Sequence, residues 1–313
     1  MSACKNIALF GECMLELQGT AFGAIRQGYG GDTFNTAVYL VRCGGESIRV
    51  WYASAVGDDP LSTELLKHWA ADGIGLELVR RINGRMPGLY MIEVDERGER
   101  SFSFWRDTSA AKAYFDIDVT PLEERAEQWD ALYLSGISLA ILPPAGRERL
   151  FALAAAMRSR GAEVVFDSNY RSRLWPSIDE AQSAFNRAFA LATTAFVSTD
   201  DHQALFGLSS PEEAVVVAQA LSPPELLIKG GAAATLVRSP GIAWQAVPTE
   251  LVRNVVDTTA AGDSFAAGYL SRRLRGADAV EATRFGNRLA ARVIQYPGAM
   301  IPASAMSDLM AAR

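Results

Sequence analysis

The residues of this sequence best suited to chemistry lie in one stretch, 255–270, where a turn of small residues precedes a predicted helix. Val255-Val256 has strand character, and residues from Ser264 onward have the apolar spacing of a helix. The turn 259–262 is expected to present several backbone N–H groups at the start of that helix, a site that favours negative charge and especially phosphate. Asp263 follows directly. A carboxylate beside an anion site is what the transfer of a proton or a phosphoryl group would need.

The same stretch allows a simpler interpretation. Threonine and aspartate are common N-cap residues, so the pattern is also that of a well-capped helix that follows a strand. The rest of the chain has to decide between the two.

A second segment with glycines before a predicted helix begins at Gly30-Gly31. Adjacent glycines let a ligand approach backbone N–H groups closely, because no side chain lies in the way. Asp32 or Thr33 is expected to cap the helix, and Gly44-Gly45 to end it. The apolar stripe of this helix is Phe34, Ala37, Val38 and Val41. A plain turn before a helix is the alternative interpretation.

Polar residues also follow two predicted strands. Strand 163–166 leads into Asn169, Arg171 and Arg173, and strand 226–229 ends in Lys229-Gly-Gly231. Ligands of parallel sheets bind beyond the carboxyl ends of the strands. The planar fork of arginine suits a carboxylate or a phosphate, and a lysine beside glycines suits the phosphates of a nucleotide. Surface salt bridges are the alternative for the arginines.

Alternating strands and helices predict that an α/β fold with a mainly parallel central sheet, flanked by helices, positions these segments. Residues 89–94 and 100–105 interrupt this alternation and predict a β-hairpin around Asp95–Gly98. The hairpin is expected to form a lid or a dimer surface, or else an antiparallel edge of the main sheet. The other expected strands are 7–10, 50–56, 132–134 and 194–197, and the other expected helices are 61–71, 147–160 and 279–295.

Composition narrows the possible classes of protein. The 313 residues are 49% hydrophobic and carry a net charge of −6, which argues against a nucleic-acid or anionic-membrane surface. No run of 18 apolar residues is present, so no membrane span is expected. The N-terminus leaves no room for a secretory signal before the first strand. Cys4, Cys13 and Cys43 lack metal-type spacing and are expected to be reduced thiols in a cytoplasmic protein.

Several familiar motifs are missing from the sequence. It contains neither a P-loop nor the glycine fingerprint of a dinucleotide-binding fold. His68 and His202, the only two histidines, have no zinc-type spacing and no serine-hydrolase motif around them. Metallohydrolases and serine hydrolases are therefore excluded as classes, and a dehydrogenase loses its main support.

Taken in order, these features resemble the ribokinase-like (PfkB) family of sugar kinases over essentially the whole chain. Gly30–Asn35 resembles the N-terminal Gly-Gly substrate motif of the family, and Asp257–Asp263 resembles its C-terminal signature, usually Asp-x-x-Gly-Ala-Gly-Asp. The likeness is greatest to members that act on the sugar acid 2-keto-3-deoxygluconate. The segments that carry it are Gly11–Met14, Pro87–Tyr90, Phe104–Arg106, Leu134–Ile141 and Asn169–Trp175.

This resemblance implies a single ribokinase-like domain, 1–313, with a small β-lid formed by approximately 13–29 and 85–106. It implies ATP-dependent phosphorylation of the 6-hydroxyl of the sugar acid, with Mg²⁺, in a homo-oligomer assembled through the lid, and no nucleic-acid or membrane partner. Asp263 would be the catalytic base. The substrate-binding residues would be Gly31, Asp32, Asn35, Tyr90, Phe104, Arg106 and Arg171. The ATP-binding residues would be Asn169, Lys229, Gly230, Gly231, Ala260, Ala261, Gly262 and Asn287.

The sequence departs from the family pattern at two places. Ala260 stands where the wider family has glycine, so the turn is slightly less permissive although its N–H donors remain. The acidic Asn-x-x-Glu motif that the family links to Mg²⁺ is present only as Ser198–Asp201, and no direct metal ligand is assigned to Asp201. Asp200 and Asp201 could also simply complement the dipole of the helix that is expected to start at this segment.

Three other functions are compatible with parts of the pattern. A kinase of the same family could act on a neutral acceptor such as fructose, ribose or a nucleoside, but Arg106 and Arg171 favour an acidic one. A non-catalytic sugar-acid sensor on a kinase scaffold is disfavoured by the intact Asp263. An NAD-dependent dehydrogenase would lack its glycine fingerprint.

Overall fold

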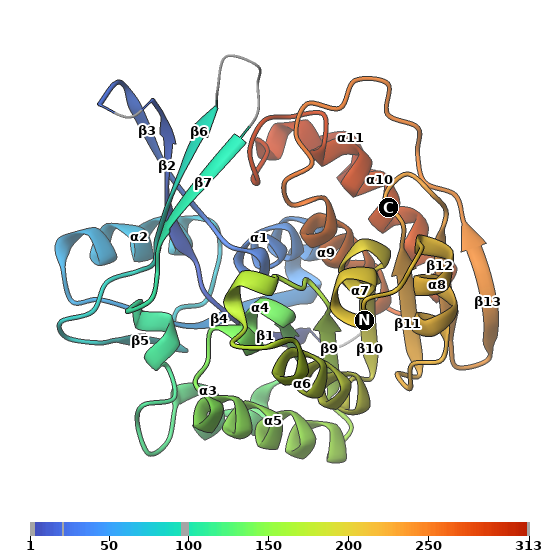
Figure 1. The fold of residues 1–313 in the computed structure, drawn as a ribbon, viewed down its shortest axis with the longest axis horizontal. Coiled ribbons are helices and arrows are strands. Elements are labelled where there is room, and N and C mark those ends of the chain that lie inside the picture. The colour runs from blue at the N-terminus through green and yellow to red at the C-terminus, as the bar shows by residue number, and fades with distance from the viewer. Residues whose placement is uncertain (1–3, 21, 95–99, 312–313) are drawn as a thin grey trace.

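The computed structural model describes residues 4–20, 22–94 and 100–311. They form a ribokinase-like α/β fold around a nine-stranded sheet with the strand order β13-β12-β11-β10-β9-β8-β1-β4-β5 (Figure 1). Strands from β11 to β5 run parallel, and β12 and β13 add an antiparallel edge. The strands are β1 (Lys5–Phe10), β4 (Ile48–Val56), β5 (Val79–Arg81), β8 (Ala131–Ser135), β9 (Glu163–Asp167), β10 (Thr194–Ser198), β11 (Glu225–Lys229), β12 (Thr235–Ser239) and β13 (Ile242–Val247).

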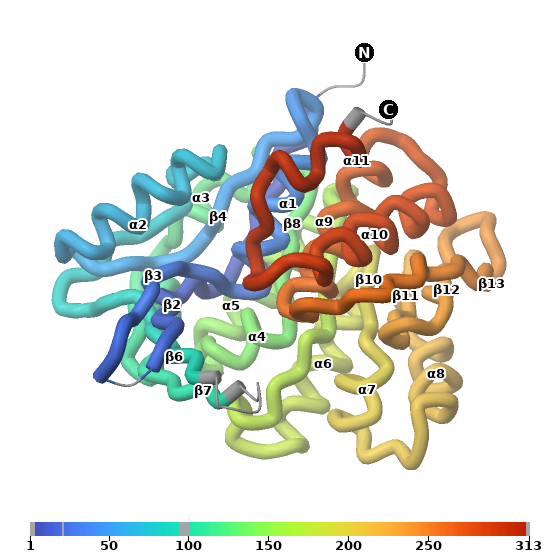
Figure 2. The backbone as a smooth tube through the Cα atoms, turned by 90° about the horizontal axis from the view of Figure 1, so that it is seen from above, coloured from blue at the N-terminus to red at the C-terminus, as the bar shows by residue number. Residues whose placement is uncertain are grey.

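Helices cover both faces of this sheet (Figure 2). Because side chains alternate along a strand, Ile7 and Leu9 of β1 enter one core while Ala8 and Phe10 enter the other. The first core is closed by α1 (Asp32–Gly44), α2 (Pro60–Ala71), α9 (Ala261–Arg273), α10 (Ala279–Val293) and α11 (Ser307–Ala311). The second is closed by α3 (Pro121–Glu124), α4 (Gly136–Ala140), α5 (Pro144–Ser159), α6 (Ile178–Leu191), α7 (Thr199–Phe206) and α8 (Pro211–Gln219). Short 3₁₀ helices are η1 (Gly45–Ser47), η2 (Ala110–Ala113), η3 (Ala126–Gln128), η4 (Ser172–Leu174) and η5 (Ala303–Met306).

The predicted hairpin belongs to a separate four-stranded sheet, which we call the small sheet (Figure 1). Its strand order is β3-β2-β6-β7, formed by β2 (Met14–Gly19), β3 (Ile25–Gly30), β6 (Leu89–Val94) and β7 (Arg100–Trp105). Two antiparallel hairpins meet in a parallel pair between β2 and β6. The alternative that the hairpin extends the main sheet is therefore wrong. Its predicted turn, 95–98, lies outside the described residues.

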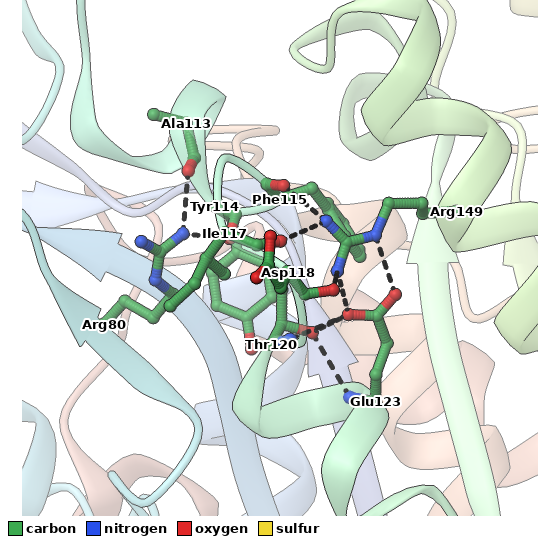
Figure 3. A network of polar contacts seen from close by, with 9 residues as sticks. All are labelled: Arg80, Ala113, Tyr114, Phe115, Ile117, Asp118, Thr120, Glu123 and Arg149. Carbon is green, nitrogen blue, oxygen red and sulfur yellow. Dashed lines mark hydrogen bonds and ion pairs between the residues drawn. The ribbon is translucent and has the colours of Figure 1, made fainter.

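Two arginines fasten the segment that leads from β7 back to the main sheet (Figure 3). Arg149 of α5 donates to the Phe115 carbonyl oxygen at 2.6 Å and pairs with Glu123, whose pKa the guanidinium helps to lower despite burial. Glu123 also completes a capping box with Thr120 at the start of α3. From the other side, Arg80 donates to the Ala113 carbonyl oxygen at 2.9 Å. The exit of the small sheet is thus anchored to the domain body.

Two predictions about the stretch 255–270 were wrong. Val255-Val256 is not a strand: both side chains are about half exposed, and only Val256 N–H bonds across, to the Ile294 carbonyl oxygen at 2.8 Å. Having no neighbouring strand to pair with, the two residues remain in a loop. The helix after the turn begins at Ala261, earlier than expected, so Asp263 lies within its first turn. Among the helices of the described ranges, none has the length and apolar character to cross a membrane.

Candidate active site

The starts of α1 and α9 meet beyond the carboxyl ends of β9 and β11, where the topology of a parallel sheet places ligands. Thr36, which is fully buried, connects the two helices: its Oγ1 lies 3.0 Å from the Asp32 carbonyl oxygen and 3.4 Å from that of Asp263. Asp167 is the last residue of β9, and Lys229 the last of β11. Segments far apart in the sequence thereby bring three aspartates and one lysine together.

Asp263, the expected base, is held by an amide from the other motif. Asn35 Nδ2 donates to Asp263 Oδ2 at 2.8 Å, and the Gly31 N–H points to Asn35 Oδ1 at 3.5 Å. Asn35 is buried and Asp263 is half-buried. The two motifs are therefore joined directly, and the bond leaves Asp263 Oδ1 for another partner.

The neighbouring carboxylates perturb one another. Burial, Asp32 and Asp167 raise the pKa of Asp263 well above its usual range, while the Asn35 amide and the Lys229 ammonium oppose this. The pKa of Asp167 is also raised, chiefly by burial, although Lys229 Nζ lies 3.5 Å from its Oδ1. Four charges in such proximity are typical of a functional site. A cationic ligand bound here would stabilise the charged forms of Asp167 and Asp263.

The turn before α9 offers fewer free N–H groups than expected, because Thr259 N–H donates to the Asp257 carboxylate and Ala261 N–H donates to the Thr258 carbonyl oxygen at 3.2 Å. The N–H groups of Gly262 and Asp263 have no acceptor among the described residues, as expected for the first turn of a helix. A Cβ at Gly262 would lie 3.4 Å from Lys229 Nζ, so the ammonium group approaches the same turn. Asp257, the first residue of the signature, to which the sequence analysis assigned no role, fixes the turn: its carboxylate accepts from Thr259 N–H at 2.9 Å and Gly298 N–H at 2.8 Å.

Ala260 has the backbone conformation that makes glycine preferable. Its φ of 60° and ψ of 15° lie in the left-handed region, and it occupies the N-cap position of α9. A residue with a Cβ is strained there. The departure of this chain from the family signature therefore falls on a position where it has a conformational cost.

The small sheet adds residues next to the Gly-Gly motif. A Cβ at Gly31 would lie 2.1 Å from the Glu12 carbonyl oxygen, so only glycine fits there. Tyr90, which lies beside Phe104 with ring centroids 6.0 Å apart, donates its hydroxyl proton to Glu16. Tyr90 and Phe104 are thus on the same side of the small sheet, as their proposed shared ligand requires.

The two arginines expected to bind the sugar acid are both paired with acids. Arg106 is buried against Glu12, and only 9% and 1% of these two side chains are exposed. Arg171 contacts Asp201 at 3.2 Å, but 53% of its side chain is exposed. The pKa of Asp201 is raised by burial, and Arg171 acts against this rise. The exposed Arg171 can therefore move to contact a ligand. Arg106 could do so only by breaking its buried ion pair with Glu12.

The residues expected to bind ATP outside the α9 turn come from three separate places: after β9, after β11 and from α10. Asn169 has a φ of 27°, and its Nδ2 donates to Asp32 Oδ2 at 2.8 Å. Asn287 is buried and makes bonds within the protein, from Thr235 Oγ1 at 2.9 Å and to the Pro248 carbonyl oxygen at 3.1 Å. Gly230 and Gly231 follow β11, with Gly231 in the left-handed region. In this structure Asn287 therefore connects α10 to the β12–β13 edge of the main sheet through hydrogen bonds.

Glu12, Glu16 and Asp167 are polar residues of this region that sequence reasoning did not select. Of these three, Asp167 could have been identified from the sequence, since an acid at the end of a predicted buried strand lies at the ligand-binding edge of the sheet. Among the described residues, no group of three histidines, cysteines or acids could hold a metal ion directly.

A hollow of about 370 Å³ lies elsewhere, at the amino ends of β1 and β9. Its cations are all satisfied: Lys5 pairs with Asp130 at 3.0 Å, Arg273 pairs with Glu225 at 2.6 Å, and Arg160 donates to the Trp129 carbonyl oxygen at 2.9 Å. It therefore offers no unpaired cation among the described residues to bind an anionic substrate, and the candidate site is the one at the opposite edge of the sheet.

Comparison with known proteins agrees with this geometry. The model of the pfkB family carbohydrate kinases matches residues 5–306. The chain is 44% identical to 2-dehydro-3-deoxygluconokinase of Dickeya dadantii (strain 3937), over 96% of this chain and 98% of that protein. It is 42% identical to 2-dehydro-3-deoxygluconokinase of Escherichia coli (strain K12), over 96% and 99%. Among solved structures, aminoimidazole riboside kinase from Salmonella enterica complexed with aminoimidazole riboside and an ATP analogue superposes with a TM-score of 0.81, at 25% identity over 98% of this chain and 100% of that chain.

Proposed function

The chain belongs to the pfkB family of carbohydrate kinases, and we propose that it transfers the γ-phosphoryl group of ATP to the 6-hydroxyl of 2-keto-3-deoxygluconate. This sugar acid, also called 2-dehydro-3-deoxygluconate, is the one in the names of relatives 42% and 44% identical to the chain. The observation that carries the proposal is the position of Asp263, between the free N–H groups of the α9 turn and the Asn35 amide.

Asp263 is the base in this reaction. Its Oδ1 would accept the proton of the 6-hydroxyl as the hydroxyl oxygen attacks phosphorus, while Asn35 holds the other carboxylate oxygen. The Gly262 and Asp263 N–H groups and the Lys229 ammonium would stabilise the charge on the transferred phosphoryl group. Since burial and the neighbouring carboxylates raise the pKa of Asp263, kcat/KM should begin to fall, as the pH is lowered, at a pH above the usual range of an aspartate.

Mg²⁺ would enter with ATP, and the chemistry that it would supply is neutralisation of the phosphate charge. The described residues form no cage of three ligands for it, which fits an ion that keeps most of its waters. Among the described residues, Asp167 has Lys229 as its one cationic partner and Asp32 has none, so these two carboxylates would face the hydrated ion. Asp201 is not proposed as a ligand because it pairs with Arg171.

The other expected residues divide between acceptor and donor. Gly31, Asp32, Asn35, Tyr90, Phe104 and Arg171 are proposed to contact the sugar acid, with Arg171 facing its carboxylate. Arg106 is proposed to line the same site, with a smaller share in charge recognition because Glu12 already neutralises it. Asn169, Lys229 to Gly231, Ala260 to Gly262 and Asn287 are proposed to lie along ATP.

Three broader expectations also remain proposals. The small sheet, segments 13–29 and 85–106, would act as a lid. Phe102, Phe104 and Trp105, each 45% to 59% exposed, favour a homo-oligomer built through it. The three free cysteines fit a reducing compartment such as the cytoplasm.

Replacing Asp263 with asparagine tests the proposal. Asp263→Asn should lower kcat by roughly 10²- to 10⁴-fold while the circular dichroism spectrum and the unfolding midpoint remain close to wild type. Asp200→Asn, an exposed aspartate in the first turn of α7, is the matched control and should have normal turnover. Near-normal turnover by a folded Asp263→Asn variant would exclude it as the base.

A further inference from the structure

The small sheet carries a carboxylate, Glu16, that the reaction described above does not use. Glu16 lies in one row across all four strands: Gly28 of β3 and Tyr90 of β6 are its register partners, and Phe104 of β7 is the partner of Tyr90. Register partners project from the same side of a sheet, so these four residues share a face. Two of them, Tyr90 and Phe104, are already proposed to contact the substrate.

This face of the small sheet is connected to Asp263 through Gly30 and Asn35. A Cβ built at Gly30 would lie 3.5 Å from the Tyr90 hydroxyl oxygen and 3.4 Å from Asn35 Oδ1, so both groups border the same glycine. Asn35 in turn donates to Asp263 at 2.8 Å. The Glu16–Tyr90 pair therefore lies along the path on which the acceptor would extend away from its reacting hydroxyl.

The Glu16–Tyr90 pair can accept hydrogen bonds from a ligand but has no proton left to donate to one. Tyr90 donates its single hydroxyl proton to Glu16 Oε2, and burial with the nearby carboxylate raises the pKa of Tyr90, which keeps that proton in place. Glu16 Oε1 has no donor among the described residues. The glycine at position 28 leaves room beside it, since a Cβ there would already approach Oε1 to 3.5 Å.

An acceptor-only group of this kind selects the chemistry of its ligand. It binds hydroxyl groups, which have a proton to donate, and it repels a carboxylate, which has none. Of the two arginines proposed to line the acceptor site, Arg171 is the exposed one, with 53% of its side chain exposed. A sugar acid would therefore bind with its hydroxyls toward Glu16 and its carboxylate away from it.

We propose that Glu16 is a specificity-determining residue that, with Tyr90, binds a secondary hydroxyl of the acceptor and sets the direction of the sugar acid, so that the 6-hydroxyl and not the carboxylate reaches Asp263. This rests on the proposed function, since it assumes a polyhydroxy acid as the acceptor.

The test is Glu16→Gln, measured with ATP and 2-keto-3-deoxygluconate. The amide keeps the shape of the side chain but loses the charge and presents a donor. KM for the sugar acid should rise roughly 10- to 100-fold, the loss expected for a hydrogen bond to a charged group, and KM for ATP should change less than about twofold. Gln18→Ala is the matched control: Gln18 lies two residues on, on the same face, bonded to Arg26, and its loss should leave both constants unchanged.

Deoxy analogues of the acceptor distinguish a direct contact from damage to the small sheet. With the 4-deoxy or the 5-deoxy acid, whichever lacks the bound hydroxyl, Glu16→Gln should no longer raise KM. Equal rises with all three acceptors, or parallel rises for ATP, would overturn the proposal, as would an unchanged KM. Failure of the wild-type protein to phosphorylate any of these acids would instead contradict the proposed function, so the two failures are distinguishable.

Discussion

The buried pair of Glu12 and Arg106 gives a prediction that separates structure from substrate recognition. Both side chains are almost fully enclosed, and Arg106 Nε and Glu12 Oε1 have no further partner among the described residues. Removing one member of such a pair leaves an uncompensated buried charge, which costs about 3 to 5 kcal/mol. Glu12→Gln and Arg106→Met should each lower the free energy of unfolding by about that amount.

The variant that carries both substitutions shows whether the loss in the free energy of unfolding comes from an unpaired buried charge. With both charges absent, Glu12→Gln/Arg106→Met should lose far less than the sum of the single losses, giving a coupling free energy of about 3 kcal/mol or more. Urea unfolding followed by circular dichroism measures all four proteins. The exposed pair of Arg171 and Asp201 is the control, because a half-exposed ion pair contributes at most about 1 kcal/mol.

Two results would refute this reasoning. Losses below about 1 kcal/mol for both single variants would mean that the pair is not buried as the structure has it. A double variant whose loss equals the sum of the single losses would mean that the two charges do not depend on each other. In either case Arg106 would be free to bind the sugar acid as strongly as Arg171.

Three further predictions concern single side chains. Arg171→Ala should raise KM for the sugar acid by roughly 10- to 100-fold with little change in KM for ATP, and equal effects in steady-state kinetics would count against its carboxylate role. Ala260→Gly should relieve a left-handed strain of about 1 to 2 kcal/mol at an entropic cost of about 0.5 to 1 kcal/mol, so the unfolding midpoint should rise slightly with kcat unchanged; a lower midpoint would contradict the strain. His202 is 1% exposed, its ring nitrogens are unpartnered, and burial lowers its pKa from 6.5 to about 4. The unfolded chain therefore binds this proton first, and stability falls as pH drops from 6.5 toward 4, by about 3 kcal/mol at most. His202→Phe should flatten this part of the pH dependence in urea unfolding, and an unchanged slope would exclude His202 as its source.

Local pattern was sufficient for many of the elements, and together with the family resemblance it identified the two motifs. Residues 89–94 and 100–105 were expected as strands and are β6 and β7 with the same bounds. Gly31 and Asn35 were selected from one segment, Asn35 through the family resemblance, and Asp263 from another; the structure joins the three by hydrogen bonds. These predictions succeed because glycine spacing, helix starts and strand alternation are properties of short segments.

Pairing between distant segments was beyond the reach of local pattern. Nothing near Arg106 indicates that Glu12, 94 residues away, neutralises it. Glu16 meets Tyr90 only because β2 and β6 pair in parallel across 74 residues. Val255-Val256 has the composition of a strand but no neighbour to bond with, which only the sheet topology determines. Charge compensation in the acceptor site is therefore a property of the fold and not of the motifs.

The most direct test of the proposed reaction is a single measurement on the wild-type protein. ADP release with ATP and Mg²⁺ is followed across a panel of 2-keto-3-deoxygluconate, fructose, ribose and a nucleoside, and the product is identified by ³¹P and ¹H NMR. The proposal predicts rapid turnover with the sugar acid alone and a phosphate ester at its 6-position. Faster turnover of a neutral sugar, a phosphate at another position, or binding of the sugar acid without any ADP release would contradict it.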